Sequence, residues 1–299
     1  MPAIKSGHSL PPVRIAALTV LAMIAFAGNS LLCRLALQQT AIDPASFTAI
    51  RLFSGALVLW LLLRARGGTA ATAGNWLSAC ALFAYAAAFS FAYISLSAAA
   101  GALILFGAVQ ATMIGYGLWR GERLHELQLA GLVLAAAGLI SLLLPGLSAP
   151  PWQGALLMLG AGAAWGIYSL RGKTSGDPLA VTAGNFLRTV PFAAGLSLIL
   201  QGHAQPDPAG IIYAMASGAL ASGVGYAIWY AALPGLKATS AATVQLSVPV
   251  IAAIGGMVFL GEPLTLRLLL CAAAILGGIA LVIRPRRTVM PSTQPLRPS

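Results

Sequence analysis

The apolar residues of this chain gather into long runs, and short segments rich in glycine, proline and charged residues separate one run from the next. A run of about 20 apolar residues forms an α-helix long enough to cross the ~30 Å hydrocarbon core of a bilayer. Ten such runs predict ten helices, at residues 14–37, 43–63, 75–95, 97–119, 124–144, 152–171, 178–200, 208–232, 238–260 and 264–284. We therefore expect an all-α polytopic membrane protein.

The composition points to the same class. Hydrophobic residues make up 59% of the 299 residues, charged residues make up only 8%, and the mean hydropathy is +0.88. A soluble domain is typically about 25% charged. The net charge of +11 would indicate a nucleic-acid partner in a soluble protein, but here the basic residues lie almost entirely in short loops and tails. We expect a lipid bilayer around the protein and no nucleic acid.

The distribution of lysine and arginine predicts the orientation of the helices. Alternate loops and both tails hold Lys5, Arg14, Arg64, Arg66, Arg120, Arg123, Arg171, Lys173, Lys237, Arg284, Arg286, Arg287 and Arg297. The opposite side holds only Arg34, Arg51 and Arg267, each within or beside a helix. Cytoplasmic loops are enriched in basic residues, so both tails, 1–13 and 285–299, are expected in the cytoplasm. The short loops also predict that sequential helices are antiparallel neighbours.

No motif predicts a metal site, a cofactor or an enzyme. The cysteines Cys33, Cys80 and Cys271 lie in apolar runs without metal-ligand spacing, and we expect them to be buried thiols. The three histidines lie in tails or loops, at His8, His125 and His203. The six acidic residues fall in loops or first helical turns, at Asp43, Glu122, Glu126, Asp177, Asp207 and Glu262. An embedded enzyme needs titratable or nucleophilic groups that converge at depth.

Two halves of the chain resemble each other. The segment 120–145 lies 140 residues before the segment 260–285, and Gly-Glu, glycine and proline positions recur at that spacing. Further upstream the spacing is 137 residues and relates Arg34 to Arg171 and Arg51 to Arg188. This pattern predicts two five-helix repeats, 14–145 and 152–284. An odd number of helices inverts the second repeat, which is a recurrent transporter architecture around a central site.

The ninth predicted helix, 238–260, combines features that suit the wall of a central pathway. Small residues crowd its start, and small residues let helices approach closely in lipid. Pro249 removes one backbone hydrogen bond and is expected to kink the helix near its middle. Gln245 is costly in lipid, so its amide is expected to face the bundle or a wet cavity.

These motifs resemble the EamA-type family of the drug/metabolite transporter superfamily, over nearly the whole chain. The second half carries the pattern at Thr239, Ser240, Ala241, Ala242, Pro249, Gly261, Glu262, Gly277 and Gly278. The first half departs from it at Ala111 and Thr112, where the family has a proline. Gly-Asn-Ser at 28–30 and Ala-Trp-Gly at 164–166 are similar to the family's Trp-Gly motifs. The resemblance implies export of small metabolites across an inner membrane, with amino acids and drugs among the cargoes.

Two aromatic stripes are candidates for lining a substrate cavity. The third predicted helix places Ala81, Tyr85, Phe89 and Tyr93 at four-residue steps. The eighth places Gly218, Ser222, Tyr226 and Tyr230 at the equivalent positions. Four-residue steps keep side chains roughly on one helix face. Tyr85, Phe89 and Tyr226 lie deepest and are the stronger candidates, because tyrosine near a helix end is common at the membrane interface.

Polar and aromatic residues of other helices complete the predicted site. Asn29 shares a face with Phe26, Ser30 and Cys33, and either contacts substrate or makes an interhelical hydrogen bond. Trp165 lies away from the headgroup belt where tryptophan is favoured, and Tyr168 follows it. The predicted substrate-binding residues are Asn29, Tyr85, Phe89, Phe106, Trp165, Tyr168, Tyr226 and Gln245, with Gln110 as a weaker candidate.

Charged residues near helix ends have structural interpretations. Glu122 and Glu262 are expected to cap the fifth and tenth helices, where a carboxylate favours the positive end of the helix dipole. Arg51 and Arg188 are embedded and equivalent under the repeat. We expect them to extend towards the membrane surface, with binding of a carboxylate as the alternative.

The sequence therefore predicts an inner-membrane exporter of small amphipathic metabolites, foremost aromatic or other neutral amino acids. Because no titratable residue is expected at mid-membrane depth, we expect alternating access without ion coupling. The alternative is a proton-driven multidrug or metabolite exporter of the same fold. An open channel is less consistent with inverted repeats and bulky aromatic residues. We expect the protein to function as a monomer.

Overall fold

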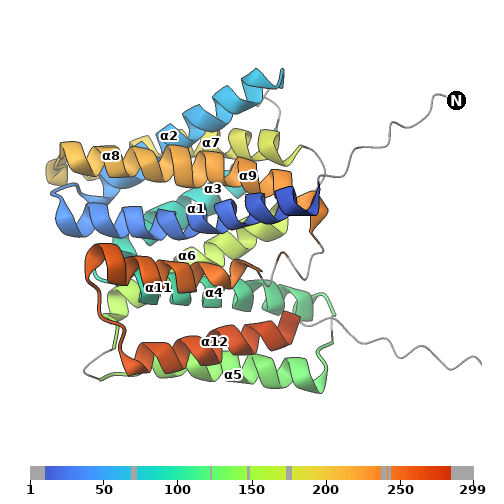
Figure 1. The fold of residues 1–299 in the computed structure, drawn as a ribbon. Helices are drawn as coiled ribbons and strands as arrows, with labels where there is room; N and C mark the ends of the chain where they lie inside the picture. Colours follow the sequence, from blue (N-terminus) through green and yellow to red (C-terminus); the bar gives the residue numbers. More distant parts are fainter. Residues whose placement is uncertain are drawn as a thin grey trace, which may run out of the picture.

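The computed structural model describes residues 11–68, 73–121, 123–146, 149–172, 177–236, 241 and 244–283. These residues are almost entirely helical, and no strand occurs among them (Figure 1). The first half contains α1 (Pro12–Gln39), α2 (Pro44–Ala65), α3 (Trp76–Ala92), α4 (Ala98–Trp119) and α5 (Glu126–Leu143). The second half contains α6 (Trp152–Arg171), α7 (Pro178–Ile199), α8 (Pro208–Ala216), η2 (Ser217–Val224), α9 (Gly225–Ala232), α11 (Ser247–Leu260) and α12 (Leu266–Ile283).

Several predicted positions lie outside the described residues. They include Glu122, most of the small-residue block at 237–242, and the tails up to residue 10 and from residue 284. Within the described part, α8, η2 and α9 follow one another without a break, so the helices correspond to the ten predicted spans. Helix α1 begins and α12 ends at the same end of the bundle (Figure 1).

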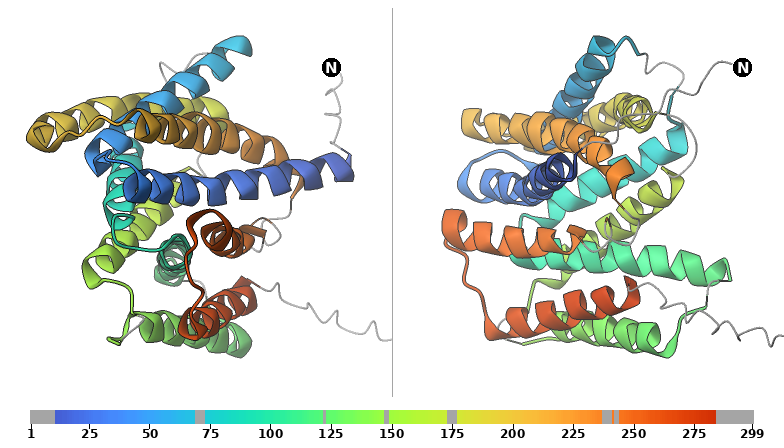
Figure 2. Two further views of the ribbon diagram at one scale, coloured as in Figure 1. Left: turned by 60° about the vertical axis from the view of Figure 1, so that its left-hand side comes forward. Right: turned by 45° about the vertical axis from the view of Figure 1, so that its right-hand side comes forward.

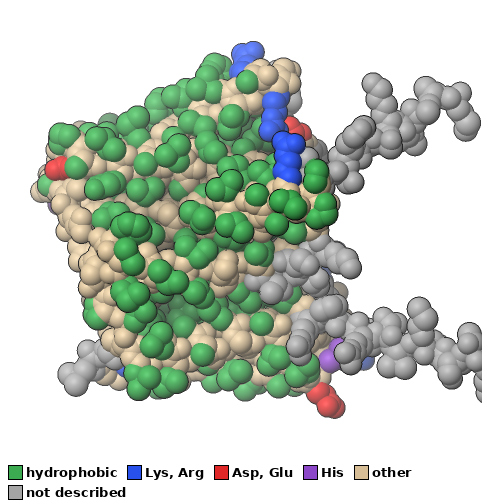
Figure 3. Space-filling view, viewed as in Figure 1, with side chains coloured by type: hydrophobic (Ala, Val, Ile, Leu, Met, Phe, Trp, Pro, Cys, Tyr) green, Lys and Arg blue, Asp and Glu red, His purple; other side chains and the backbone are tan. Residues whose placement is uncertain are grey.

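The helices have the length and surface of a multi-pass membrane protein. Six of the described helical stretches are long and apolar enough to cross a bilayer, and α3 and α11 are shorter apolar helices. Apolar side chains cover the face shown in Figure 3, while basic side chains gather at the end where α1 begins. The outward faces of α5 and α12 carry large apolar side chains that are each about half exposed or more: Leu127, Val133, Leu269 and Leu270. An apolar surface of this extent is suited to lipid and not to water.

Asp-Pro pairs determine where three of the helices begin. Asp43, Asp177 and Asp207 each accept a hydrogen bond from a backbone N–H of the first turn. A proline follows each of them at the first helical position, where its missing N–H has no cost. Asn75 and Ser97 cap α3 and α4 in the same manner. The loop chemistry recognised in the sequence therefore sets these helix starts.

The expectation that sequential helices are neighbours is wrong for the principal contacts. The most extensive packing joins the two halves of the chain: α5 with α12, α3 with α6, α4 with α6, α2 with α7, and α1 with α9 and α11 (Figures 1 and 2). By comparison, α1 and α2 touch only slightly, as do α4 and α5. Lipid tails are as apolar as leucine, so hydrophobicity does not select helix partners in a membrane. Close steric fit selects them instead.

Glycines show where that fit is closest. A Cβ on Gly131 of α5 would lie 2.6 Å from the Gly278 carbonyl oxygen of α12, and a Cβ on Gly278 would lie 2.5 Å from the Gly131 oxygen. A Cβ on Gly162 of α6 would lie 2.6 Å from the Leu105 oxygen of α4. These backbones approach closely because a glycine lies at each contact, which is the usual way in which transmembrane helices pack closely.

The ninth predicted helix is interrupted close to Pro249, where the sequence predicted a kink. The regular helix is interrupted at Leu246, which keeps αR dihedral angles, and α11 begins at Ser247, so Pro249 lies in the first turn after the interruption. Proline is tolerated in a first turn because the N–H there has no intrahelical acceptor. Ser247 Oγ donates to the Val244 carbonyl oxygen at 2.7 Å, which satisfies one of the carbonyl groups at this break.

Two further local expectations need correction. Cys33 and Cys271 are buried as predicted, but Cys80 is exposed on the outer face of α3. A thiol is apolar enough to face lipid, so an apolar run does not specify burial inside the protein. The eighth predicted helix is also not regular, because its centre widens into the π-helical segment η2. Segments of this type are frequent at functional sites.

Candidate functional site

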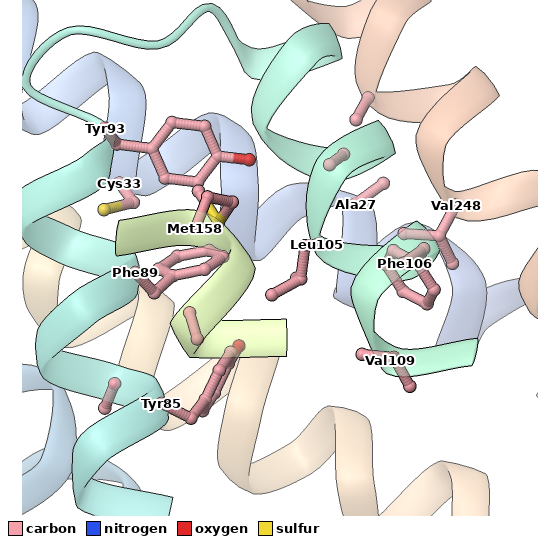
Figure 4. Packing of buried hydrophobic residues seen from close by; sticks show 14 of the residues in the cluster. Ala27, Cys33, Tyr85, Phe89, Tyr93, Leu105, Phe106, Val109, Met158 and Val248 are labelled. Carbon is pink, nitrogen blue, oxygen red and sulfur yellow. The ribbon is translucent and has the colours of Figure 1, made fainter. Parts of the chain in front are cut away.

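A small, largely buried cavity lies where the two halves of the chain meet. The first half contributes Phe26, Asn29, Ser30, Tyr85, Phe89, Leu105 and Phe106, and the second half contributes Trp165, Ala221, Ser222 and Tyr226. Its volume is about 30 Å³, enough for a water molecule and far below the ~300 Å³ of a typical ligand pocket. Figure 4 shows part of its lining, with Tyr85 and Phe89 on α3 and with Leu105 on α4 directed towards them. The cavity is occluded in this conformation.

Trp165 of α6 is the centre of the aromatic lining. Its ring stacks on that of Tyr226 with centroids 5.5 Å apart and an interplanar angle of 17°. Tyr85 lies 4.8 Å and Tyr168 5.4 Å from it, measured between centroids. Phe26 of α1 completes the group at 5.6 Å from Tyr226. The rings therefore join α1, α3, α6 and α9 in one cluster, with residues from both halves.

The predicted stripe on α3 forms a column of rings along the helix. Tyr85 and Phe89 lie 5.4 Å apart, and Phe89 and Tyr93 lie 4.7 Å apart in an edge-to-face arrangement (Figure 4). Tyr93 does not line the cavity, because its ring is fully buried against Gly101 and its hydroxyl donates to the Ala98 carbonyl oxygen at 3.4 Å. Tyr93 therefore fills the junction of α3 and α4 at the end of the column.

A chain of hydrogen bonds crosses the cavity wall. Ser217 Oγ of η2 donates to Asn29 Oδ1 at 2.7 Å, and Asn29 Nδ2 donates to the Tyr85 hydroxyl at 3.3 Å. Arg51 Nη2 donates to the same hydroxyl at 3.1 Å. The acceptor role of Oδ1 towards Ser217 orients the amide so that Nδ2 faces Tyr85. Asn29 therefore makes interhelical hydrogen bonds, as one of its two interpretations expected, and it also lines the cavity.

Arg51 does not extend to the membrane surface as expected. Its side chain is 2% exposed, and its guanidinium carbon lies 4.8 Å from the Phe89 ring centroid and 5.3 Å from that of Tyr85. Gly218 of η2 packs directly on the Arg51 backbone. Because η2 packs closely against this turn of α2, the Arg51 side chain points into the protein and does not reach the membrane surface.

Arg188, the repeat counterpart of Arg51, has a different environment. Its Nη1 donates to the Ala73 carbonyl oxygen at 2.6 Å and to the Gly184 carbonyl oxygen at 2.9 Å. Arg188 is half-buried near the end of the bundle and ties the loop before α3 to α7. The two arginines are equivalent in sequence position only.

Six of the eight predicted site residues line the cavity, and two do not. Tyr168 is buried beneath Trp165 and accepts a hydrogen bond from Asn185 Nδ2 at 3.5 Å. Gln245 Nε2 donates to the Ala241 carbonyl oxygen within its own segment, at 3.3 Å. Sequence reasoning did not select Ser217, Leu105 or Ala221, because small and aliphatic residues are ubiquitous in apolar helices.

Glu262 does not cap the tenth helix. Thr265 caps α12, with its hydroxyl accepting from the Leu268 N–H at 3.2 Å. Glu262 instead accepts from the Ala98 N–H at the start of α4, at 2.7 Å, and pairs with Arg34 Nε of α1 at 3.0 Å. The reason is the turn after α11, where Gly261 adopts a φ of 63° and the Glu262 N–H bonds to the Gly256 oxygen. That turn directs the carboxylate away from α12.

The Arg34–Glu262 pair lies at the wall of a wider hollow. This hollow has a volume of about 380 Å³, lies at the end of the bundle where α1 ends, and is also lined by Gln38, Ser97 and Pro151. Arg34 Nη1 donates to the carbonyl oxygens of Tyr93 and Ile94 as well. The pair therefore fastens α1, α3, α4 and the segment before α12 together between the hollow and the occluded cavity.

Comparison with known proteins identifies the second half of the chain. Residues 152–284 match the EamA-like transporter family. An uncharacterized protein of Pseudomonas aeruginosa is 61% identical over 278 residues, which cover 93% of this chain and 97% of that protein. The threonine/homoserine exporter RhtA of Escherichia coli is 36% identical over 163 residues, and that of Salmonella typhimurium is 33% identical over 160 residues. These matches span 51% of this chain and 54% of the exporters.

A solved structure shares the fold over most of its length. One crystal structure superposes with a TM-score of 0.65 at 19% sequence identity, and it covers 89% of this chain and 96% of that chain. The helical architecture is therefore common to both proteins. Together with the family match, it confirms the resemblance read from the motifs: the chain is a multi-pass membrane protein that carries an EamA-like transporter domain at residues 152–284.

Proposed function

We propose that this protein exports small amphipathic metabolites, foremost aromatic or other neutral amino acids, across the cell inner membrane. The observation that carries the proposal is the occluded cavity at the junction of the two halves, lined by Tyr85, Trp165 and Tyr226. Flat aromatic faces suit the apolar part of such a molecule, and the Asn29 and Tyr85 polar groups suit its zwitterionic end. Each half supplies part of the lining, so relative movement of the halves would open it.

Alternating access fits the packing of the helices. Helix pairs that the predicted repeat makes equivalent are both in contact. The contact of α3 with α6 corresponds to that of α9 with α1, and the contact of α4 with α6 corresponds to that of α11 with α1. Such pairing is expected if the two halves are inverted repeats. In this proposal the closed cavity is an occluded intermediate, and the Arg34–Glu262 pair belongs to the outer closure. Opening on one side then requires one group of helices to rock against the other.

The amino-acid assignment rests on two lines of support. The relatives of Escherichia coli and Salmonella typhimurium are named as threonine/homoserine exporters. The aromatic lining of this cavity favours a larger apolar side chain than those two amino acids carry. We therefore extend the cargo class to neutral amino acids in general, with aromatic ones preferred.

The positions of the acidic groups support the proposal of transport without ion coupling. Asp43, Asp177 and Asp207 cap helices, and Glu126 lies in the first turn of α5. Glu262 is engaged by Arg34 and Ala98. Among the described residues no carboxylate or histidine lines the cavity. Proton-coupled carriers usually need such a group at depth, so we propose movement down the substrate's own gradient, by a monomer with both tails in the cytoplasm.

Counterflow in liposomes tests this proposal. Purified protein is reconstituted and loaded with unlabelled L-phenylalanine, and entry of labelled L-phenylalanine, L-threonine and a cationic drug is followed with and without a proton or sodium gradient. We expect saturable exchange of the amino acids that is unchanged by either gradient. Accumulation above equilibrium that an ionophore abolishes would contradict uncoupled transport, and exchange of the drug alone would support the multidrug alternative.

A further inference from the structure

Arg51 is a buried cation without a counter-ion. Its Nε and Nη1 atoms have no hydrogen-bond partner among the described residues, and the side chain is 2% exposed. The described carboxylates are all engaged elsewhere or distant in the fold, as caps of α2, α7 and α8, in the first turn of α5, or in the pair with Arg34. An unpaired buried charge is strongly unfavourable. A retained charge of this kind indicates a partner that arrives from outside the chain.

The hydrogen-bond directions around Tyr85 indicate what that partner is. The Tyr85 oxygen accepts from both Arg51 Nη2 and Asn29 Nδ2. Its own proton remains to be donated, and Tyr85 lines the cavity. The polar end of the cavity thus presents donors that are polarised by a full positive charge, while no described acid lies beside them. This set of groups suits an anionic oxygen pair and disfavours a cation.

We propose that Arg51, acting with the Tyr85 hydroxyl, recognises the carboxylate of the transported molecule. The inference rests on the proposed function for the identity of the cavity, and it adds a rule: cargo must carry an acid group, and cationic drugs without one are excluded. Phe89 and Tyr85 line the cavity, and the centroids of their rings lie 4.8 and 5.3 Å from the guanidinium carbon of Arg51. Rotation of these rings as the cluster opens exposes the guanidinium to the carboxylate. The unbonded Nε–H or Nη1–H then acts together with the second N–H of Nη2, so that two parallel bonds form to the carboxylate.

Matched acid and amide ligands test the rule by equilibrium binding. Thermal unfolding of the purified full chain is followed with L-phenylalanine, L-phenylalaninamide, L-threonine and L-threoninamide, and apparent affinities are taken from the shift with ligand concentration. In each amide an uncharged –CONH2 group replaces the carboxylate, so the negative charge is lost and an N–H donor replaces one acceptor oxygen. For whichever amino acid binds better, we expect an apparent affinity about tenfold or more higher than that of its amide. This is the usual scale of a charged hydrogen bond.

Arg51→Met is expected to abolish that preference and leave the unfolding temperature without ligand unchanged or raised, since it removes an unpaired buried charge. Arg51→Lys keeps the charge without the two-pronged geometry and is expected to retain part of the preference. Arg188→Met is the matched control, because its carbonyl contacts are structural. It is expected to lower the unfolding temperature and keep the preference for the acid.

Three outcomes overturn the inference: wild-type protein that binds the amides as tightly as the acids, wild-type protein that binds neither, and an Arg51→Met variant that keeps the preference. Transport is measured separately in liposomes. Arg51-dependent binding of acids without exchange would refute the export function while the carboxylate site stands. Exchange of amides as fast as acids would support a transporter and refute the carboxylate site.

Discussion

At the scale of single residues, Trp165 decides how well the cavity holds a flat substrate. Its ring contacts Tyr85, Tyr168 and Tyr226, so Trp165→Ala removes the centre of the aromatic lining. An aromatic pair contributes about 0.5–1.5 kcal/mol, so losing one contact to substrate lowers affinity roughly 2- to 12-fold. The measurement is the half-saturating concentration of L-phenylalanine in counterflow.

Trp152 on the same helix provides the control for this substitution. It lies at the start of α6, 66% exposed and away from the cavity. Trp152→Ala removes the same number of atoms and is expected to leave the half-saturating concentration unchanged. Equal effects of the two substitutions would show that Trp165 acts through folding or insertion rather than through substrate contact.

Glu262 is the second residue with a distinct expected effect, on stability. Its carboxylate accepts from the Ala98 N–H and pairs with Arg34, and its side chain is only 8% exposed. Glu262→Ala leaves the partly buried Arg34 without its counter-ion and the Ala98 N–H unsatisfied, which costs on the order of 3 kcal/mol in the free energy of unfolding. Glu262→Gln keeps an acceptor for the N–H and should cost less. Unfolding in detergent measures both.

Glu126→Gln is the reference for these variants. Glu126 is exposed in the first turn of α5, where a surface substitution changes stability by about 0.5 kcal/mol or less. A double-mutant cycle with Arg34→Met isolates the pair itself. Additive losses in that cycle would mean that Arg34 and Glu262 stabilise the outer end independently, contrary to the geometry.

At the scale of helices, the α5–α12 pair depends on one point of backbone contact. Gly278→Ala places a Cβ 2.5 Å from the Gly131 oxygen and 2.6 Å from the Ala135 nitrogen, so the helices must separate. Overpacking of this kind costs about 1–3 kcal/mol. The neighbouring Gly277 faces open space, and Gly277→Ala should stabilise slightly because alanine is the better helix former. Unfolding temperatures in one detergent compare the pair, and a similar loss in both variants would argue against the contact.

At the scale of the whole molecule, the ends of the bundle carry different charges. Arg64, Arg66, Arg120 and Arg123 are exposed at the end where α1 begins, whereas Asp43 and Asp207 cap helices at the other end. The basic end is expected to face the cytoplasm. A cysteine-free protein with His203→Cys should react with a membrane-impermeant maleimide in intact cells. Arg123→Cys should react only after permeabilisation, and the reverse pattern would overturn the orientation.

The sequence by itself determined the class of the protein and the approximate limits of its helices. Long apolar runs and Asp-Pro pairs such as Asp43–Pro44 and Asp207–Pro208 act within one helix and its first turn. Their effect can therefore be predicted without knowledge of tertiary contacts. The stripe of Tyr85 and Phe89 could be predicted for the same reason, since a four-residue step defines a helix face. Most of the cavity-lining aromatic residues could therefore be predicted.

Only the tertiary structure decided which helices meet and what the polar residues do. Ser217 and Asn29 are 188 residues apart, and Arg34 and Glu262 are 228 apart, yet each pair forms a hydrogen bond. Arg51 became a buried, unpaired cation because Gly218 of the irregular segment η2 packs on its backbone. Hydrophobicity does not encode such contacts, because a helix face that meets lipid and one that meets another helix are equally apolar. Steric fit and hydrogen bonds between distant segments decide them, and those exist only once the halves are packed together.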